Sequence, residues 1–285
     1  MSTRVRTHQE TPAAKGGSSL RIAAVQMASG PTVSANLTEA AVLIKLAAKQ
    51  GAKLIALPEY FGIIGMKDGD KVAVREAFGH GPIQDFLSST AKKLGVWLVG
   101  GSVPLACDDP GRVRNSCLAY NDRGELVARY DKIHLFGFEM GQERYKEEAT
   151  IEAGDEVVVF DSPFGRVGLS ICYDLRFPEL YRKMQPVDLI LVPAAFTETT
   201  GKAHWEPLLR ARAIENLAYV LAPAQGGFHR NGRETHGDSM IIDPWGVVLD
   251  RLQRGSGVVI ADIDPAYQAR MRQSLPALSH RAIAC

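Results

Sequence analysis

The chain has 285 residues, of which 46% are hydrophobic and 23% are charged, and its 33 Lys and Arg against 32 Asp and Glu leave a formal net charge of +1. This composition is that of a soluble globular protein and excludes global disorder. A near-neutral chain also excludes functions that depend on bulk attraction to nucleic acid or to anionic lipid. No apolar run approaches the roughly 18 residues of a membrane-spanning helix, so we expect no membrane partner.

Residues 1–19 contain charges, Gly and Ser but no apolar segment, which predicts a flexible tail rather than a signal peptide. Residues 20–285 show no linker-like composition and no internal repeat, so we expect them to form one domain. The four cysteines, at positions 107, 117, 172 and 285, form no CxxC pair. Isolated thiols favour a reducing compartment over a disulfide framework. We therefore expect a cytoplasmic protein.

The first half of the chain alternates apolar strands with amphipathic helices. A stripe of apolar residues at i, i+3, i+4 and i+7 spacing predicts the first helix, which Gly51 ends. Asn36 and Glu39 have the spacing of a capping box at its start. The predicted elements are strand 21–27, helix 34–50, strand 54–57, helix 83–94 and strand 96–105.

The second half is rich in hairpins, because turn sequences such as Asn121-Asp122-Arg123-Gly124 separate short apolar runs. The predicted elements are strands 116–120 and 125–130, strands 157–160 and 167–171, strand 189–193, helix 202–217, strand 219–224, strands 239–243 and 247–250, strand 257–263 and helix 265–273. This order predicts one α/β domain with a mixed sheet or two packed sheets.

Three reactive side chains directly follow predicted strands: Glu59, Lys132 and Cys172. Functional groups of α/β folds gather at the carboxyl ends of strands. Each residue alone has an ordinary explanation, as a strand-end carboxylate, a surface ammonium or a small buried thiol. Together they are the three groups that a cysteine hydrolase needs.

The chemistry explains why these three groups belong together. A thiol attacks well only as the thiolate, and a nearby glutamate can accept its proton and return it to a leaving amine. The tetrahedral intermediate carries an oxyanion that needs a cation or aimed N–H donors. Lys132 and the backbone amide of Tyr173, which follows Cys172, would supply them.

The motifs LPEYF (residues 57–61), YDKIHLF (130–136) and SICYDLRFPE (170–179) resemble the Glu–Lys–Cys triad of the nitrilase superfamily of carbon–nitrogen hydrolases. The resemblance extends from about residue 21 to the C-terminal helix. It implies a four-layer α-β-β-α sandwich and a mechanism without cofactor. It also implies that Glu59 is the general base, Lys132 the oxyanion stabiliser and Cys172 the nucleophile that forms a thioester.

The resemblance further implies a second glutamate beside the lysine. Glu147 is the candidate, with Glu143 and Glu148 as neighbouring alternatives. Arg176 either binds a substrate carboxylate or pairs with Asp174 or Glu179 to fix its loop. The remaining predicted substrate-binding residues, taken from positions beside these motifs and past the neighbouring strand, are Tyr60, Tyr173, Phe196, Thr197 and Thr200.

The residues around the cysteine distinguish branches of the superfamily. Cys172-Tyr173-Asp174 differs from the Cys-Trp-Glu of authentic nitrilases, and Leu175-Arg176 lacks the paired arginines of N-carbamoyl amino-acid hydrolases. The segments 199–206 (TTGKAHWE) and 210–215 (RARAIE) resemble Nit-type amidases, a group that includes deaminated glutathione amidase and ω-amidase.

The resemblance implies cleavage of a small α-keto acid amide by water, with release of ammonia, and deaminated glutathione is the favoured substrate. Three alternatives remain open: an ω-amidase acting on α-ketoglutaramate, an N-carbamoyl amino-acid amidohydrolase, and a silent scaffold that binds a protein partner.

Two further expectations concern metals and assembly. His134 and His204 lack partners at metal-ligand spacing, so we expect no metal site. The family commonly forms dimers through outer helices, and the predicted helix 202–217 is the candidate surface for a homodimer or higher oligomer. Its stripe of Trp205, Leu208, Leu209 and Ala213 suits either the core or a subunit contact.

Overall fold

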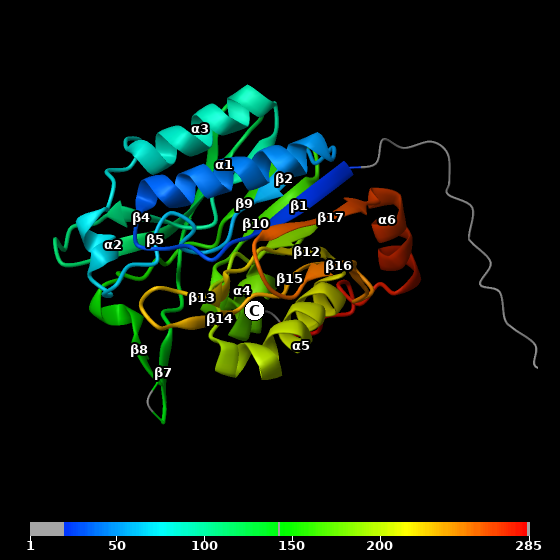
Figure 1. Ribbon diagram of the computed structural model, residues 1–285. Coiled ribbons are helices and arrows are strands. Elements are labelled where there is room, and N and C mark those ends of the chain that lie inside the picture. The colour runs from blue at the N-terminus through cyan, green and yellow to red at the C-terminus, as the bar shows by residue number, and fades with distance from the viewer. Residues whose placement is uncertain (1–19, 142, 284–285) are drawn as a thin grey trace, which may run out of the picture.

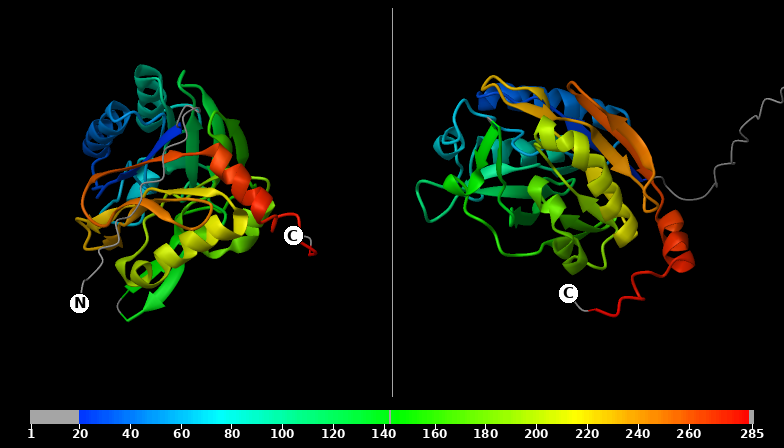
Figure 2. Two further views of the ribbon diagram at one scale, coloured as in Figure 1. Left: turned by 90° about the vertical axis from the view of Figure 1, so that its right-hand side faces the viewer. Right: turned by 90° about the horizontal axis from the view of Figure 1, so that it is seen from below.

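The computed structural model describes residues 20–141 and 143–283, so the tail predicted at residues 1–19 lies outside the described part. Two β-sheets pack face to face, and helices cover their outer faces (Figure 1; Figure 2, left). The α-β-β-α sandwich implied by the resemblance is therefore confirmed. None of the helices in the described ranges combines the length and the apolar character that crossing a bilayer requires.

The first sheet has the order β17-β1-β2-β3-β5-β4, and β6 pairs with β5. Strands β1, β2 and β3 run parallel to one another, and β17 adds antiparallel to β1. The strand bounds are β1 (Leu20–Gln26), β2 (Leu54–Ala56), β3 (Trp97–Val99), β4 (Val103–Ala106), β5 (Val113–Tyr120), β6 (Leu126–Asp131) and β17 (Gly257–Ile263).

The second sheet has the order β16-β15-β12-β11-β10-β9. Its central strands β10, β11 and β12 are parallel, and the outer strands are antiparallel to their neighbours. The strand bounds are β9 (Val159–Ser162), β10 (Gly165–Leu169), β11 (Leu189–Leu191), β12 (Tyr219–Ala222), β15 (Ser239–Ile242) and β16 (Val248–Leu252).

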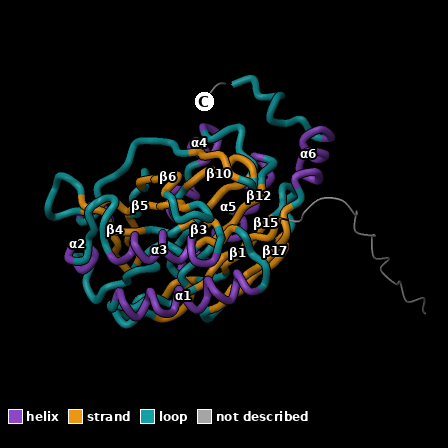
Figure 3. The backbone as a smooth tube through the Cα atoms, turned by 90° about the horizontal axis from the view of Figure 1, so that it is seen from above, coloured by secondary structure: helices purple, strands orange, loops and turns teal. Residues whose placement is uncertain are grey.

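Helices α1 (Val33–Lys49) and α3 (Pro82–Leu94) lie side by side over the first sheet (Figure 3), and α4 (Pro178–Lys183) and α5 (Glu198–Asn216) cover the second. Smaller elements surround one end of the sandwich, and α6 (Pro265–Ser274) lies at the other (Figure 1). These smaller elements are α2 (Asp70–Ala73), the hairpins β7 (Gly137–Met140)–β8 (Glu143–Lys146) and β13 (Gly226–Phe228)–β14 (Glu234–His236), and the 3-10 helices η1 (Glu147–Ala149) and η2 (Cys172–Arg176).

The period-2 geometry of β1 divides the core into two parts. Ile22 and Ala24 face the second sheet, whereas Ala23 and Val25 face the helices, and all four are fully buried. A parallel strand that is buried on both faces has a continuous apolar sequence, and such a run predicted this strand. This packing fixes the strands whose ends carry the reactive side chains.

The capping box predicted for the first helix is wrong. Helix α1 begins at Val33 after Thr32, and Asn36 lies one turn inside it. The Asn36 side chain is buried, accepts a hydrogen bond from the Gly30 amide at 2.8 Å and donates to the carbonyls of Gly30 and Gly62 at 2.9 Å. Asn36 therefore ties two loops to the helix instead of capping it.

The single strand predicted over residues 96–105 is two strands, β3 and β4. Gly101 between them has a φ of +47°, and a Cβ on it would lie 2.0 Å from the Pro58 carbonyl oxygen. Only glycine fits this close approach. The break therefore lets the β3–β4 connection pack directly on the turn that carries Glu59.

Candidate active site

The ends of both sheets bring Glu59, Lys132 and Cys172 together. Glu59 follows β2 and Lys132 follows β6 in the first sheet, while Cys172 follows β10 in the second. Glu59 and Cys172 line one cavity, to which Glu147 of η1 also contributes. The three residues that the sequence singled out thus share one site, between the two layers of the sandwich.

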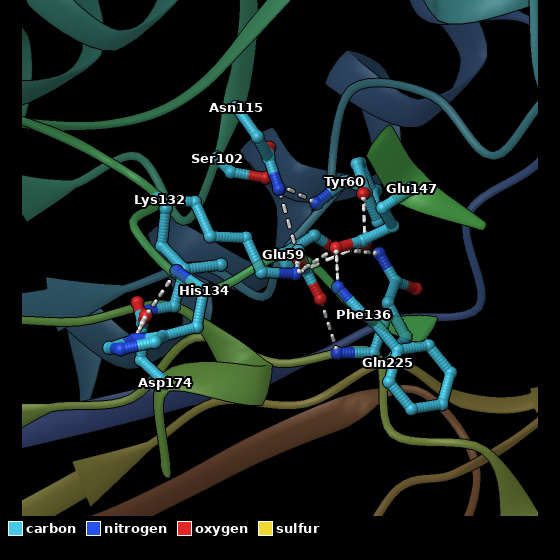
Figure 4. A network of polar contacts seen from close by, with 12 residues as sticks. Glu59, Tyr60, Ser102, Asn115, Lys132, His134, Phe136, Glu147, Asp174 and Gln225 are labelled. Carbon is cyan, nitrogen blue, oxygen red and sulfur yellow. Dashed lines mark hydrogen bonds and ion pairs between the residues drawn. The ribbon is translucent and has the colours of Figure 1, made fainter. Parts of the chain in front are cut away.

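Lys132 is fully buried, and its ammonium binds two carboxylates (Figure 4). Its Nζ donates to Glu59 Oε1 at 2.8 Å and to Glu147 Oε2 and Oε1 at 2.8 and 3.1 Å. Buried charges of this kind are tolerated when each is paired and hydrogen-bonded. One cation shared by two acids leaves the trio with a net charge of −1 when both carboxylates are ionised.

Backbone and amide groups orient the Glu59 carboxylate (Figure 4). Its Oε1 also accepts from Asn115 Nδ2 at 2.9 Å, and its Oε2 accepts from the Ala195 amide at 3.0 Å. Gln225 Nε2 donates to the Glu59 carbonyl at 3.0 Å. The next residue, Tyr60, has a φ of +57°, and its amide donates to Ser102 Oγ at 2.9 Å. Side-chain and backbone hydrogen bonds therefore fix the turn formed by Glu59 and Tyr60.

The two glutamates differ in their electrostatic environment. Burial raises the pKa of Glu59, and the Lys132 ammonium only partly counteracts this effect. Burial would also raise the pKa of Glu147, but Lys132 and hydrogen bonds from the Phe136 amide and the Tyr60 hydroxyl hold it below its usual value. Glu59 is thus the more basic carboxylate and the one suited to take up a proton.

The same contacts keep Lys132 charged. Burial disfavours the ammonium, but the carboxylates of Glu147 and Glu59 outweigh it and raise the pKa of Lys132 well above its usual value. The cation is therefore available for stabilising negative charge near the Cys172 sulfur throughout the physiological pH range.

Cys172 begins the 3-10 helix η2 in a left-handed conformation, with a φ of +52°. Its amide donates to the Pro193 carbonyl at 2.9 Å, and its side chain lines the same cavity as Glu59. Burial and the neighbouring Glu59 charge raise the pKa of the thiol well above its usual value. A raised pKa favours the protonated thiol, which becomes a good nucleophile only when a base takes its proton.

A buried carboxylate, Asp174, connects the cysteine turn to the lysine segment. Its Oδ2 accepts from the Tyr130 hydroxyl at 2.6 Å and the Ile171 amide at 2.8 Å. Its Oδ1 accepts from the His134 amide at 3.0 Å and lies 2.7 Å from His134 Nδ1. His134 thus takes part in hydrogen bonding, and no group of three potential metal-ligating side chains occurs within residues 20–141 and 143–283.

The structure places Glu147, rather than Glu148, beside the lysine. Glu148 is exposed and pairs with Lys146 at 3.2 Å. Glu143 lies in β8, and its side chain is outside the described part of the chain. Tyr60 joins the same network, because its hydroxyl donates to Glu147 Oε1 at 2.8 Å.

The other predicted binding residues surround a smaller hollow beside Cys172. Tyr173, Arg176, Phe196, Thr197 and Thr200 line it, and Thr197 also lines the main cavity. The Thr197 and Thr200 hydroxyls bond each other at 2.9 Å, and Thr197 caps helix α5.

Arg176 forms neither of the ion pairs that the sequence left open. Its guanidinium lies over the rings of Tyr173 and Phe196, and its Nη1 is 3.2 Å from His204 Nδ1. Asp174 is instead occupied by His134 and Tyr130. Arg176 therefore flanks the cysteine without a carboxylate partner among the described side chains.

Sequence reasoning missed several residues of the site. Asn115 lies inside a strand, where nothing in the pattern distinguishes it from an ordinary polar position. Lys71 and Arg233 line the main cavity from short surface elements that have no periodic signal. Asp174 belongs to the cysteine motif, but only the structure shows that its carboxylate is buried.

Comparisons with known proteins agree with this geometry. The family model described as carbon-nitrogen hydrolase matches residues 21–273. A deaminated glutathione amidase of Synechocystis is 44% identical over 265 residues, covering 91% of this chain and 97% of the relative. An omega-amidase, NIT2, of Xenopus tropicalis is 39% identical over 261 residues, covering 90% and 92%.

Among solved structures, the NitFhit protein of C. elegans superimposes with a TM-score of 0.86 at 37% identity. The alignment covers 93% of this chain and 65% of that longer protein. Fold, site geometry and sequence similarity thus lead to one conclusion: the chain belongs to the carbon–nitrogen hydrolase family of the nitrilase superfamily and is a hydrolase of carbon–nitrogen bonds other than peptide bonds.

Proposed function

We propose that the chain is a cysteine amidase that hydrolyses the amide of a small α-keto acid through a thioester on Cys172. The observation that carries this proposal is the buried Lys132 ammonium held between Glu59 and Glu147, two carboxylates that line the same cavity as Cys172. These groups supply a nucleophile, a base and a cation, which acyl transfer from an amide requires.

In the first half-reaction, the Cys172 sulfur attacks the amide carbonyl while its proton passes to Glu59. Lys132 and the Tyr173 backbone N–H stabilise the oxyanion of the tetrahedral intermediate. Glu59 then protonates the leaving nitrogen, the C–N bond breaks, and the acyl group remains on sulfur. The raised pKa of Glu59 suits both directions of this proton transfer.

In the second half-reaction, water attacks the thioester after losing a proton to Glu59. The intermediate collapses, the thiol of Cys172 regains a proton, and the carboxylic acid leaves. The amine product depends on the substrate. A primary amide such as α-ketoglutaramate releases ammonia, whereas deaminated glutathione, a secondary amide, releases the dipeptide cysteinylglycine.

The names of the relatives supply the substrate candidates. The Synechocystis and Xenopus proteins are described as deaminated glutathione amidase and omega-amidase, respectively. Both names point to amides with a 2-oxoglutaryl acyl group, which share the half of the molecule that would be bound to Cys172. Deaminated glutathione is the first choice, because the relative with that name is the more similar of the two.

A substrate panel tests this function. We expect deaminated glutathione and α-ketoglutaramate to give higher kcat/KM than N-carbamoyl amino acids or simple nitriles, with 2-oxoglutarate as the measured product. Ammonia alone is an unsuitable readout, because a secondary amide does not release it. Faster turnover of a carbamoyl substrate or a nitrile would overturn the assignment of the branch. Absence of turnover of any amide would favour the silent scaffold.

Two properties of the working enzyme belong to the same proposal. A catalytic thiol must stay reduced, which favours the cytoplasm as its location. We also propose a homodimer, although the apolar stripe of α5 does not provide its surface, because Trp205, Leu209 and Ala213 are fully buried in the core. Three exposed apolar residues form the candidate surface instead: Ile214 on α5, and Trp245 and Val247 on either side of Gly246, which packs against Ile214.

A further inference from the structure

We propose that Lys71, assisted by Arg233, binds the carboxylate at the end of the substrate that is remote from the scissile amide. This inference rests on the proposed function and deepens it, because it assigns the specificity for acidic amides to two loop residues. Both side chains line the cavity that Glu59, Glu147 and Cys172 also line. The site would take any short acyl chain that ends in a carboxylate.

The first argument is the balance of charges around the cavity. Each of its acidic side chains has a cationic partner: Glu59 and Glu147 pair with Lys132, Asp68 pairs with Arg233, and Glu234 pairs with Arg254. Lys71 has no ion-pair partner among the described side chains. A positive charge without a partner faces the space in which the substrate must lie.

The second argument is the position of the Lys71 ammonium. Its Nζ lies 5.5 Å from the centre of the Tyr60 ring and 3.3 Å from Thr150 Oγ1. Tyr60 in turn bonds Glu147, so its ring separates Lys71 from the Lys132 network. Thr150 accepts one of the three ammonium protons, and a carboxylate in the cavity would provide acceptors for the other two.

The burial of the Lys71 ammonium also supports the proposal that it binds a carboxylate. Burial lowers the pKa of Lys71, even though Glu147 and Asp68 raise it. An ammonium without a partner in a partly desolvated place is unfavourable, and a bound carboxylate would remove that cost. The proposed α-keto acid carries a carboxylate that would pair with this ammonium.

The third argument is that separate segments converge to build the site. Lys71 comes from α2, and Arg233 precedes β14 in the hairpin β13–β14. Arg233 reaches across to Asp68, while Asn231 Nδ2 donates to the Gly65 carbonyl at 2.8 Å. These contacts hold the hairpin against the loop before α2, so both cations have fixed positions at the cavity.

Arg176 is the competing carboxylate ligand. It lies in the smaller hollow next to Cys172, between the rings of Tyr173 and Phe196, and does not line the main cavity. The two assignments make opposite predictions for substitutions at Lys71 and Arg176, so one set of variants separates them.

The experiment compares two amides of equal length, glutaric acid monoamide and pentanamide, which differ only in the terminal carboxylate. We expect K71M to raise KM for the acidic amide about ten- to a hundredfold, the loss typical of a charged hydrogen bond, with kcat nearly unchanged. Pentanamide should show the same kinetics with both proteins. R233M should raise KM less, because Asp68 already shares its guanidinium.

Lys93 on α3 provides the control, because it is exposed and does not line the cavity. K93M should leave KM for both amides within about twofold, as expected for a solvated charge. Equal losses of K71M on both amides would overturn the proposal and assign Lys71 a structural role through Tyr60. A loss of affinity for the acidic amide that occurs in R176M but not in K71M would also overturn it.

Glutarate binding, measured by calorimetry, separates this proposal from the proposed function, because binding needs no turnover. Weaker binding of glutarate to K71M than to the wild type supports the carboxylate site even if neither amide is hydrolysed. Equal binding to both proteins overturns the site even if the amidase activity is confirmed.

Discussion

Replacing Lys132 by Met tests whether the buried cation contributes to the fold as well as to the chemistry. A lysine at the end of a strand would contribute little to the core, and the sequence alone therefore predicts that the fold survives its loss. The structure changes this expectation, because Lys132 is fully buried and forms ion pairs with two carboxylates, of which one is 1% and the other 14% exposed. Methionine keeps the unbranched shape of the side chain up to the position of Cε and removes the charge.

Removing one partner from a buried ion pair costs about 3–5 kcal/mol, because it leaves an uncompensated charge in a poorly solvated place. In this variant Glu59 and Glu147 face each other without the cation, so we expect a loss of this size at neutral pH. A total stability of about 5–15 kcal/mol allows the variant to fold, with a clearly lower urea midpoint.

The pH dependence of this loss has a defined sign. The pKa of Glu59 is already raised by burial, and without Lys132 both carboxylates would have pKa values above those of the unfolded chain. A raised carboxylate pKa destabilises the folded state increasingly as pH rises above the unfolded value. The loss in K132M should therefore be larger at pH 8 than at pH 5.

Urea denaturation at both pH values, together with steady-state kinetics, measures these effects. We expect kcat to fall by about a hundredfold or more, the scale for losing one oxyanion-stabilising group. K132M/E147Q should regain part of the stability and none of the activity, because it removes the repulsion but not the need for a cation. K93M, which loses an exposed ammonium on α3 outside the cavity, is the control and should behave as wild type. Wild-type stability of K132M at pH 8 would refute the reasoning.

Two further substitutions test the nucleophile and the assembly. Cys172→Ala should abolish turnover, whereas Cys107→Ala and Cys117→Ala should keep it, because neither of these thiols lines the cavity; activity in Cys172→Ala would exclude the thioester mechanism. Trp245→Glu should convert the proposed homodimer to a monomer in light scattering, because Trp245 is 53% exposed beside Ile214. A monomeric wild type at working concentration would contradict the dimer, and a dimeric Trp245→Glu would place its interface elsewhere.

The sequence predicted the residues that follow strands better than the residues that contact them. Glu59, Lys132 and Cys172 each follow a strand, and the functional groups of α/β folds gather at such strand ends. The choice of Glu147 over Glu143 and Glu148 required the structure, because adjacent residues of one segment point in different directions and only tertiary contacts select one.

Local patterns failed where a distant segment determines the conformation. The break at Gly101 follows from its approach to Pro58, more than forty residues away along the chain. Asn36 had the spacing of a cap, but the carbonyls of Gly30 and Gly62 offered its side chain buried partners. The role proposed for Lys71 depends on the ion pairs that the other charged residues of the cavity form. None of these contacts has a signature at short sequence separation.

The position of the nucleophile relative to the cation depends on a contact between the two sheets. Glu59 and Lys132 leave the first sheet and Cys172 leaves the second, so a shift between the layers would separate them. Asp174 prevents that shift, because its carboxylate accepts hydrogen bonds from Tyr130 and His134, on either side of Lys132, and from the amide that precedes Cys172. A buried carboxylate with four donors is strongly oriented, and a neutral side chain of the same shape could not accept from all of them. The aspartate of the cysteine motif thus explains how a left-handed cysteine turn remains aligned with a lysine from another layer, although it does not itself line the cavity.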